Sequence, residues 1–317
     1  MKAPMANPTL RLGHVLEFGF LRLVELLLAP LPLSAGLWLG RRLGSLARLI
    51  DHKHRRCAEE NAARALGLST EEARELVRQV YRNIGANTTE DLMLGRLLRK
   101  KTIEELCTVE GREHLDAALA KGRGVLMLTG HFGNWELGGL IAAHLAGPVL
   151  AVARELANPL IWDYTRRWRE RVGLEVVGRR DAARRIVRHL KQGGPVLMLI
   201  DQNQREGGVF VDFFGKLAST VPTPAKLALR YDVPVLMGYI RRVGTGCQHH
   251  VKIEPVEIIR TGDFEADVVA NTARFTKKIE QFVREHPDQW FWLHRRWRKR
   301  PPWEKAQPEP PSGEPRE

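Results

Sequence analysis

The hydrophobic pattern between residues 111 and 300 alternates between two kinds of segment. Short apolar runs of strand length are separated by longer segments in which apolar residues recur every three or four positions, as on one face of a helix. Such alternation is typical of a sheet with crossover helices. We therefore predict an α/β fold, a mixed sheet flanked by helices, with strands at 125–129, 148–153, 174–177, 195–200, 209–214 and 234–240 and helices at 135–145, 160–171, 182–191 and 264–284.

The first 110 residues have a different pattern, because helical periodicity continues up to about residue 103. Residues 12–39 are rich in leucine, but Glu17, Arg22, Glu25 and two prolines interrupt them, so the segment matches a bilayer-spanning helix poorly. Its apolar residues share one helical face, which suits a helix that lies at a membrane surface. The alternative is a leucine-rich helix buried in the protein.

These patterns divide the chain into three parts. We expect 1–110 to be an N-terminal membrane-associating helical region, 111–300 the α/β domain, and 301–317 a disordered tail. The tail is rich in proline and glutamate and has little to bury. Within the first part, Ser69 and Glu72 have the spacing of a capping box, which predicts the start of a long helix.

The composition adds a strong positive charge. Lys and Arg together number 50 against 37 Asp and Glu, so the net charge is +13 with neutral histidines. This charge favours acidic partners, and the basic cluster at 41–56, directly after the leucine-rich segment, favours an anionic membrane surface. The basic residues form no recognisable nucleic-acid-binding module, so no nucleic acid is expected. The three scattered cysteines and the unpartnered histidines predict neither a metal site nor a cofactor.

The most distinctive chemistry stands where the strand at 125–129 ends. His131 follows Gly130, and Glu136 lies five positions further on, in the first turn of the predicted helix. Gly130 and Gly133 permit a tight turn, so the Glu136 carboxylate could orient the imidazole while its other nitrogen accepts a proton from a hydroxyl. The helix N-terminus should lower the pKa of His131 and keep the ring neutral. A chance pairing at this spacing is the alternative.

Several segments, in order from about residue 15 to 300, match one family. The segment GHFGNWELGG at 130–139 resembles the His-x4-Asp/Glu block of the glycerolipid and lysophospholipid acyltransferase superfamily, and the Asn-Trp inside it is typical of the lipid A biosynthesis (Kdo2-lipid IVA) acyltransferases. The other segments that are similar to blocks of this family are Asn61 in ENAARALG, Arg154 followed by Asn158-Pro159, Asp201-Gln202, GVFVDFFG at 208–215 and PDQWFWLHRRWR at 287–298.

The resemblance implies a membrane-associated O-acyltransferase on the cytoplasmic face of a bacterial inner membrane. It would move a fatty acyl group from acyl carrier protein to a hydroxyl of a lipid A precursor, a phosphorylated glycolipid. His131 would be the general base and Glu136 its catalytic partner, while Arg154, Asp201 and Gln202 would bind substrate. The alternative keeps this chemistry but has a lysophospholipid or another glycolipid as acceptor, with acyl-CoA or acyl carrier protein as donor.

Three further questions stay open from the sequence alone. A basic membrane- or nucleic-acid-binding protein without catalysis would also carry this charge. Water in place of the acceptor at His131 would make a hydrolase. Finally, Trp290, Trp292 and Trp297 could form a lipid-facing element with the neighbouring arginines, or they could belong to the core while the cations are solvated.

Overall fold

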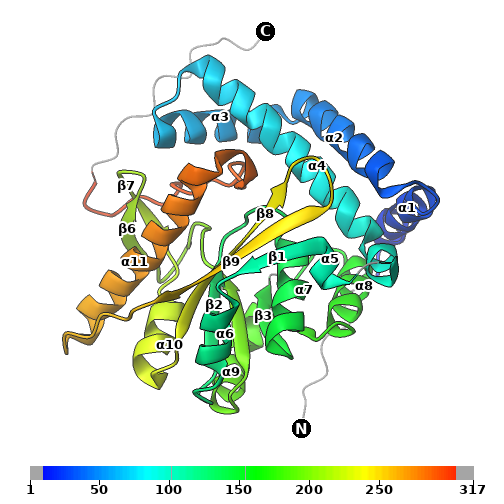
Figure 1. The fold of residues 1–317 in the computed structure, drawn as a ribbon. Helices are drawn as coiled ribbons and strands as arrows, with labels where there is room; N and C mark the ends of the chain where they lie inside the picture. Colours follow the sequence, from blue (N-terminus) through cyan, green and yellow to red (C-terminus); the bar gives the residue numbers. More distant parts are fainter. Residues whose placement is uncertain (1–9, 101, 154, 305–317) are drawn as a thin grey trace.

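The computed structural model describes residues 10–100, 102–153 and 155–304. In this part of the chain, seven strands form one sheet in the order β1-β9-β8-β2-β5-β3-β4 (Figure 1). Neighbours from β8 to β4 run parallel, β9 is antiparallel to β8, and β1 is parallel to β9. The predicted mixed sheet flanked by helices is therefore confirmed. Its strands are β1 (Cys107–Glu110), β2 (Val125–Thr129), β3 (Val149–Ala153), β4 (Leu174–Gly178), β5 (Pro195–Leu199), β8 (Val235–Val243) and β9 (Gln248–Val256).

All six predicted strands are present, within two or three residues at their ends. The fifth, β6 (Val209–Phe213), does not join the sheet but pairs antiparallel with β7 (Lys216–Thr220) in a separate hairpin. The pattern did not predict β1, β7 or β9. In β9 the buried positions alternate with partly buried histidine, lysine and glutamate positions, so the strand lacks the continuous apolar run by which the other strands were found.

The predicted all-helical N-terminal part is confirmed, and the Ser69–Glu72 capping box is formed by backbone-to-side-chain bonds of 2.8 and 3.3 Å. Later helices pack on the sheet (Figure 1). The helices are α1 (Leu12–Leu28), α2 (Leu33–Ile50), α3 (His52–Leu66), α4 (Thr70–Lys100), α5 (Ile103–Leu106), α6 (Arg112–Leu119), α7 (Trp135–Ala146), α8 (Pro159–Glu170), α9 (Arg179–Lys191), α10 (Thr223–Tyr231) and α11 (Phe264–Glu285), with a 3₁₀ turn η1 (Pro287–Gln289).

Helices α2 and α4 approach each other closely, because glycines face one another where they cross. A Cβ atom on Gly85 of α4 would lie 2.1 Å from the carbonyl oxygen of Gly40 on α2, so neither helix tolerates a larger residue at this crossing. No helix in the described part of the chain combines the length and the apolar composition of a membrane span. The N-terminal membrane association and the three-part division stay predictions, and residues 305–317 of the predicted tail lie outside the described residues.

The C-terminal segment, residues 287–298, is part of the core. Trp290, Trp292 and Trp297 are 2%, 0% and 7% exposed, so they are core residues and do not form a lipid-facing element. Arg296 departs from the expected solvated cations, because its side chain is also buried. It donates to the carbonyl oxygen of Ser219 at 2.7 Å and to the hydroxyl of Thr220 at 2.5 Å, so this segment is anchored to the hairpin.

Candidate active site

His131 and Asp201 meet because two parallel strands end side by side. Thr129, the last residue of β2, pairs in register with Leu199, the last residue of β5. Two residues after these strand ends, at the same edge of the sheet, stand His131 and Asp201. The backbone N–H of Ile200 still donates to the Thr129 carbonyl at 3.0 Å. Carboxyl ends of parallel strands are the usual place for ligand sites in α/β sheets. The register thus brings together two side chains 70 positions apart.

The Asp201 carboxylate is buried and accepts three hydrogen bonds. Its Oδ1 accepts from Nδ1 of His131 at 2.7 Å, and its Oδ2 accepts from the backbone N–H of His131 at 2.7 Å and from Nε1 of Trp290 at 2.8 Å. Burial raises the pKa of Asp201, but the charge and hydrogen bonds of His131, together with Trp290, outweigh it and hold the pKa at about 2. Asp201 is therefore ionised at neutral pH.

The pKa of His131 lies above its ordinary value, and the expected lowering by the helix N-terminus is wrong. Burial lowers this pKa, but the charge and hydrogen bond of Asp201 and the charge of Glu136 together raise it by more. Because Nδ1 donates to Asp201, the neutral ring has its lone pair on Nε2. Nε2 lies 3.2 Å from the side-chain Nε2 of Gln202. The ring is thus arranged as a general base whose Nε2 accepts the proton.

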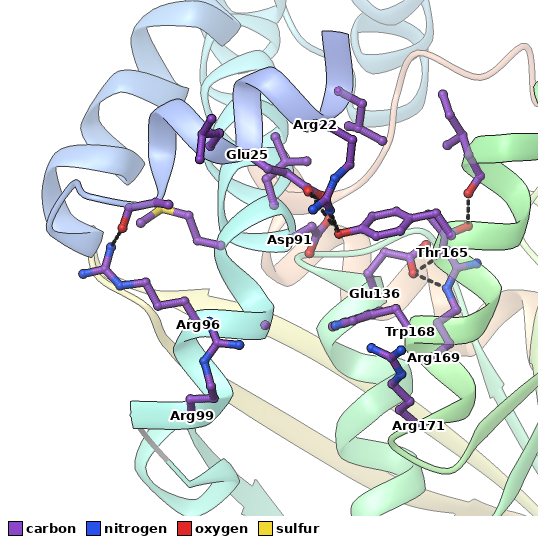
Figure 2. A pocket seen from close by; sticks show the side chains of 18 residues that line it. Arg22, Glu25, Asp91, Arg96, Arg99, Glu136, Thr165, Trp168, Arg169 and Arg171 are labelled. Carbon is purple, nitrogen blue, oxygen red and sulfur yellow. Dashed lines mark hydrogen bonds and ion pairs between the residues drawn. The ribbon is translucent and has the colours of Figure 1, made fainter. Parts of the chain in front are cut away.

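Glu136 does not orient His131, which corrects the pairing predicted from the sequence. Glu136 does stand in the first turn of α7, but its Oε2 accepts two hydrogen bonds from Arg169 of α8, at 3.0 and 2.7 Å (Figure 2). The five-residue spacing turns its side chain away from the imidazole, and Asp201, predicted to bind substrate, occupies the orienting position. Gln202 lies beside His131, and its role in substrate binding stays a prediction. Arg154 lies outside the described residues.

Two glycines allow the loop between β2 and α7 to pass close to its neighbours. A Cβ atom on Gly130 would meet Oδ2 of Asp201 at 3.0 Å. Gly133 has φ +52°, and a Cβ there would lie 2.3 Å from the carbonyl oxygen of Ile240 on β8. The second position therefore requires glycine both for its backbone conformation and for the space it leaves.

A buried network of polar side chains around Glu90, which the sequence did not predict, holds the loop between β2 and α7. Glu90 of α4 is fully buried and forms an ion pair with Arg242 of β8, whose Nη2 lies 2.5 Å from Oε2 of Glu90, and contacts His249 of β9 at 3.1 Å. Its Oε2 also accepts from the side chain of Asn134 at 2.8 Å, while Oδ1 of Asn134 accepts the backbone N–H of Leu137 and caps α7. The loop of His131 is thus tied to α4 and to two strands.

The C-terminal segment, residues 287–298, is hydrogen-bonded to the loop between β2 and α7. The N–H of Phe291 donates to the His131 carbonyl at 3.0 Å, and the N–H of Gly133 donates to the Gln289 carbonyl at 2.8 Å. The side chain of Asn61 donates to the carbonyl oxygens of Trp292 and His294, both at 3.0 Å. The sequence had marked Asn61 and 287–298 only as segments that resemble family blocks; it predicted neither their contact nor the network of Glu90.

Comparison with known proteins finds one matching family. The sequence model described as bacterial lipid A biosynthesis acyltransferase matches residues 11–299. The chain is 28% identical over 275 residues to a lipid A biosynthesis palmitoleoyltransferase of Escherichia coli (strain K12), covering 86% of this chain and 87% of that protein. It is also 28% identical over 244 residues to a phosphatidylinositol mannoside acyltransferase of Mycobacterium tuberculosis (strain CDC 1551 / Oshkosh), covering 75% of each chain.

A lipid A biosynthesis lauroyltransferase of Escherichia coli (strain K12) is 27% identical over 279 residues, which cover 87% of this chain and 89% of that protein. The family match extends over nearly the whole described chain and contains each residue of the site, from Asn61 to the C-terminal segment. The chain is therefore an acyl-transferring enzyme, and it belongs to the bacterial lipid A biosynthesis acyltransferase family.

Proposed function

We propose that the enzyme moves a fatty acyl group from the thioester of acyl carrier protein to a hydroxyl of a lipid A precursor. The observation that carries this proposal is the 2.7 Å bond between Nδ1 of His131 and the ionised Asp201, which leaves Nε2 as the proton acceptor. A base of this kind activates a hydroxyl directly, so no covalent acyl-enzyme is needed.

The reaction follows from that arrangement. Nε2 of His131 takes the proton of the acceptor hydroxyl as its oxygen attacks the thioester carbonyl, and Asp201 stabilises the imidazolium that forms. An ester C–O bond forms, the C–S bond breaks, and the leaving sulfur recovers the proton from His131. Since the side-chain amide of Gln202 faces Nε2 at 3.2 Å, the acceptor hydroxyl displaces this amide on binding.

The choice of acceptor and donor is supported by the relatives and by charge. The Escherichia coli relatives named above are lipid A biosynthesis enzymes. A net charge of +13 suits an acidic carrier protein and a phosphorylated acceptor. The mycobacterial relative, equally identical at 28%, acts on phosphatidylinositol mannoside by its name. This favours a second candidate, in which the acceptor is another phosphate-containing glycolipid and the donor is acyl-CoA or acyl carrier protein.

The test is an acyl-transfer assay of the full chain in detergent, with a lipid A precursor, a phosphatidylinositol mannoside and a lysophospholipid as acceptors. Each acceptor is offered with acyl carrier protein and with CoA thioesters. Wild type should acylate the lipid A precursor, and His131→Ala should not. His144→Ala is the matched control, because His144 is half exposed and pairs with Glu104 on the surface. Transfer only to the mannoside selects the second candidate, and equal activity of His131→Ala contradicts both.

We also propose that helices α1 and α2 lie on an anionic membrane, at the cytoplasmic face of a bacterial inner membrane. Both helices carry large apolar side chains that are exposed, and basic residues stand among them; Arg42, for example, lies 5.2 Å from the ring of Trp38. Such a face suits a helix at the lipid interface. The exposed apolar residues are Leu12, Val15, Leu16, Phe20, Leu23, Leu26 and Leu27 of α1 and Trp38, Leu43, Leu46, Leu49 and Ile50 of α2.

Vesicle co-sedimentation tests this membrane proposal. Wild type should bind vesicles that contain anionic lipid, and the double variant Phe20→Glu/Leu23→Glu should lose most of this binding because two charges would enter the interface. The control places a glutamate on another helix, at exposed Val269→Glu of α11, which lies away from α1 and α2 (Figure 1). Equal binding of the double variant and wild type would contradict the proposal.

A further inference from the structure

A cavity of about 590 Å³ lies beside Glu136, between helices α1, α4 and α8 (Figure 2). Its volume is in the usual range of sites for small ligands, about 300–1,000 Å³. Glu136 forms part of its wall, and Trp135, the preceding residue, packs on the imidazole of His131 with ring centroids 5.3 Å apart. The cavity is therefore next to the base but is not explained by the contacts of His131 and Asp201.

Hydrogen bonds between α1 and α8 hold the two helices together in the wall of the cavity. The hydroxyl of Tyr164 on α8 donates to Glu25 on α1 at 3.0 Å, and the side chain of Asn158, which caps α8, donates to Glu17 at 2.9 Å. Apolar residues of α1 also line the cavity. The cavity thus opens beside the helix that carries the largest exposed apolar face.

Two arginines of the lining have no partner among the residues that the structure describes. Arg169 binds Glu136, and Arg96 donates to the carbonyl of Leu31 at 2.7 Å. Arg99 of α4 and Arg171 at the end of α8 form no side-chain hydrogen bond or ion pair within the described ranges, and both line the cavity (Figure 2). Guanidinium groups left free in a cavity are suited to bind phosphate oxygens in pairs.

A third lining residue is unusual because one of its oxygens is buried without a partner. Oδ1 of Asp91 is out of reach of solvent and makes no hydrogen bond with the described residues. Burial, and then the charge of Glu136, raise the pKa of Asp91 well above its ordinary value. Burial thus favours the protonated carboxyl, which can both donate and accept a hydrogen bond. A buried polar atom without a partner costs stability.

We propose that this cavity binds the headgroup of the glycolipid acceptor, with Arg99 and Arg171 binding its phosphate and Asp91 bonding a sugar hydroxyl. The proposal rests on the proposed acyl transfer to a glycolipid and adds where the acceptor binds. Glu136 lines this cavity and the preceding residue, Trp135, packs on His131, so the headgroup would be held on the α7 side of the base. The lipid chains extend past α1. A phosphomonoester of a lipid A precursor and the phosphodiester of a phosphatidylinositol mannoside share this chemistry.

Steady-state kinetics with either acceptor tests the arginines. Arg99→Gln and Arg171→Gln should each raise the KM for the acceptor about tenfold, as expected for the loss of one charge-assisted bond, and leave the KM for the thioester donor unchanged. Arg74→Gln is the matched control, because Arg74 is an exposed residue on the same helix as Arg99 that pairs with Glu71. With the dephosphorylated lipid A precursor the two variants should match wild type. Unchanged acceptor KM in both variants would overturn the proposal.

Two substitutions at Asp91 separate binding from folding. Asp91→Asn keeps hydrogen-bonding groups and should retain the acceptor KM within about threefold, whereas Asp91→Leu should raise it about tenfold. The Leu variant should unfold at the same temperature as wild type or higher, because it removes an unpartnered buried oxygen. Equal acceptor KM in the two variants would overturn the role of Asp91.

Binding of the phosphorylated glycolipid in detergent, measured by calorimetry, distinguishes this inference from the proposed function. If wild type binds the lipid through Arg99 and Arg171 but transfers no acyl group, the proposed function fails and the cavity assignment stands. If transfer has a normal rate but the lipid binds equally well to the Arg99 and Arg171 variants, the proposed function stands and the cavity assignment fails. The lipid A precursor and the mannoside are measured separately, so that the phosphate source is identified.

Discussion

Asp201 holds both the ring and the backbone of His131. One carboxylate oxygen accepts Nδ1 of the imidazole and the other accepts the N–H of the same residue, each at 2.7 Å. The two bonds fix the position of the loop and the rotation of the ring together. A carboxylate on the next helix could at most have fixed the rotation of the ring. The pairing of His131 with Asp201, each just after a strand end, is therefore the more rigid arrangement for a base.

Replacing Asp201 by Asn should slow transfer by about a thousandfold or more. The amide NH2 can donate to Nδ1 and stabilise the wrong imidazole tautomer, and the neutral amide cannot stabilise an imidazolium. The direction of the pH dependence can also be predicted. The base must be neutral, and in wild type the pKa of His131 is raised, so the rate should rise with pH through a midpoint above about 6.5. In Asp201→Asn this midpoint should move to lower pH. A pH–rate profile of kcat for both proteins measures it, and an unchanged midpoint would contradict the assignment.

Glu136→Gln should have a smaller and different effect. The charge of Glu136 raises the pKa of His131 without a hydrogen bond to the ring, so its removal should also move the pH midpoint down, but by less than Asp201→Asn. Arg169 loses its ion pair and gains freedom to reach substrate. Transfer is therefore expected to fall by less than in the Asp201 variant. Loss of transfer as complete as in Asp201→Asn, at a normal unfolding temperature, would instead give Glu136 a direct part in the reaction.

Glu90→Gln should destabilise the fold by about 3–5 kcal/mol, because the guanidinium of Arg242 would stay buried without its counter-charge. Glu60→Gln is the control: Glu60 pairs with Arg56 on the surface, and its loss should cost at most about 1 kcal/mol. Urea unfolding of the three proteins gives both differences. Similar stabilities of the two variants would show that the buried pair contributes no more than a surface one.

Gly133→Ala should impair both folding and transfer, since the new Cβ would lie 2.3 Å from the carbonyl of Ile240 at a positive φ. Gly244→Ala isolates the conformational part, because Gly244 also has a positive φ (+64°) but open space around its Cβ position. The control should lose about 1 kcal/mol and keep its activity, and Gly133→Ala should lose clearly more of both. Unfolding curves and the transfer assay decide; equal losses would mean that the close approach to β8 is not needed.

Much of the site was within reach of the sequence, but one assignment in it was wrong. Local pattern placed His131 after a strand and Glu136 in a helix, and both placements are confirmed. The partner of His131 was wrong because sequence proximity favoured Glu136 over Asp201, 70 positions away. The core tryptophans of the C-terminal segment and the network of Glu90 show the same difficulty: side chains with polar or basic neighbours are buried by contacts between distant elements.

The sequence alone determined the α/β class, the positions of most strands and helices, and the family, because periodicity and motif spacing are local properties of the chain. The tertiary structure decided which carboxylate holds His131, which arginine holds Glu136, and that Asp91 faces a cavity. Each depends on the register of β2 against β5 or on how α4 and α8 pack beside α7. Register and packing depend on contacts between residues far apart in the chain, which a pattern read within one segment does not reveal.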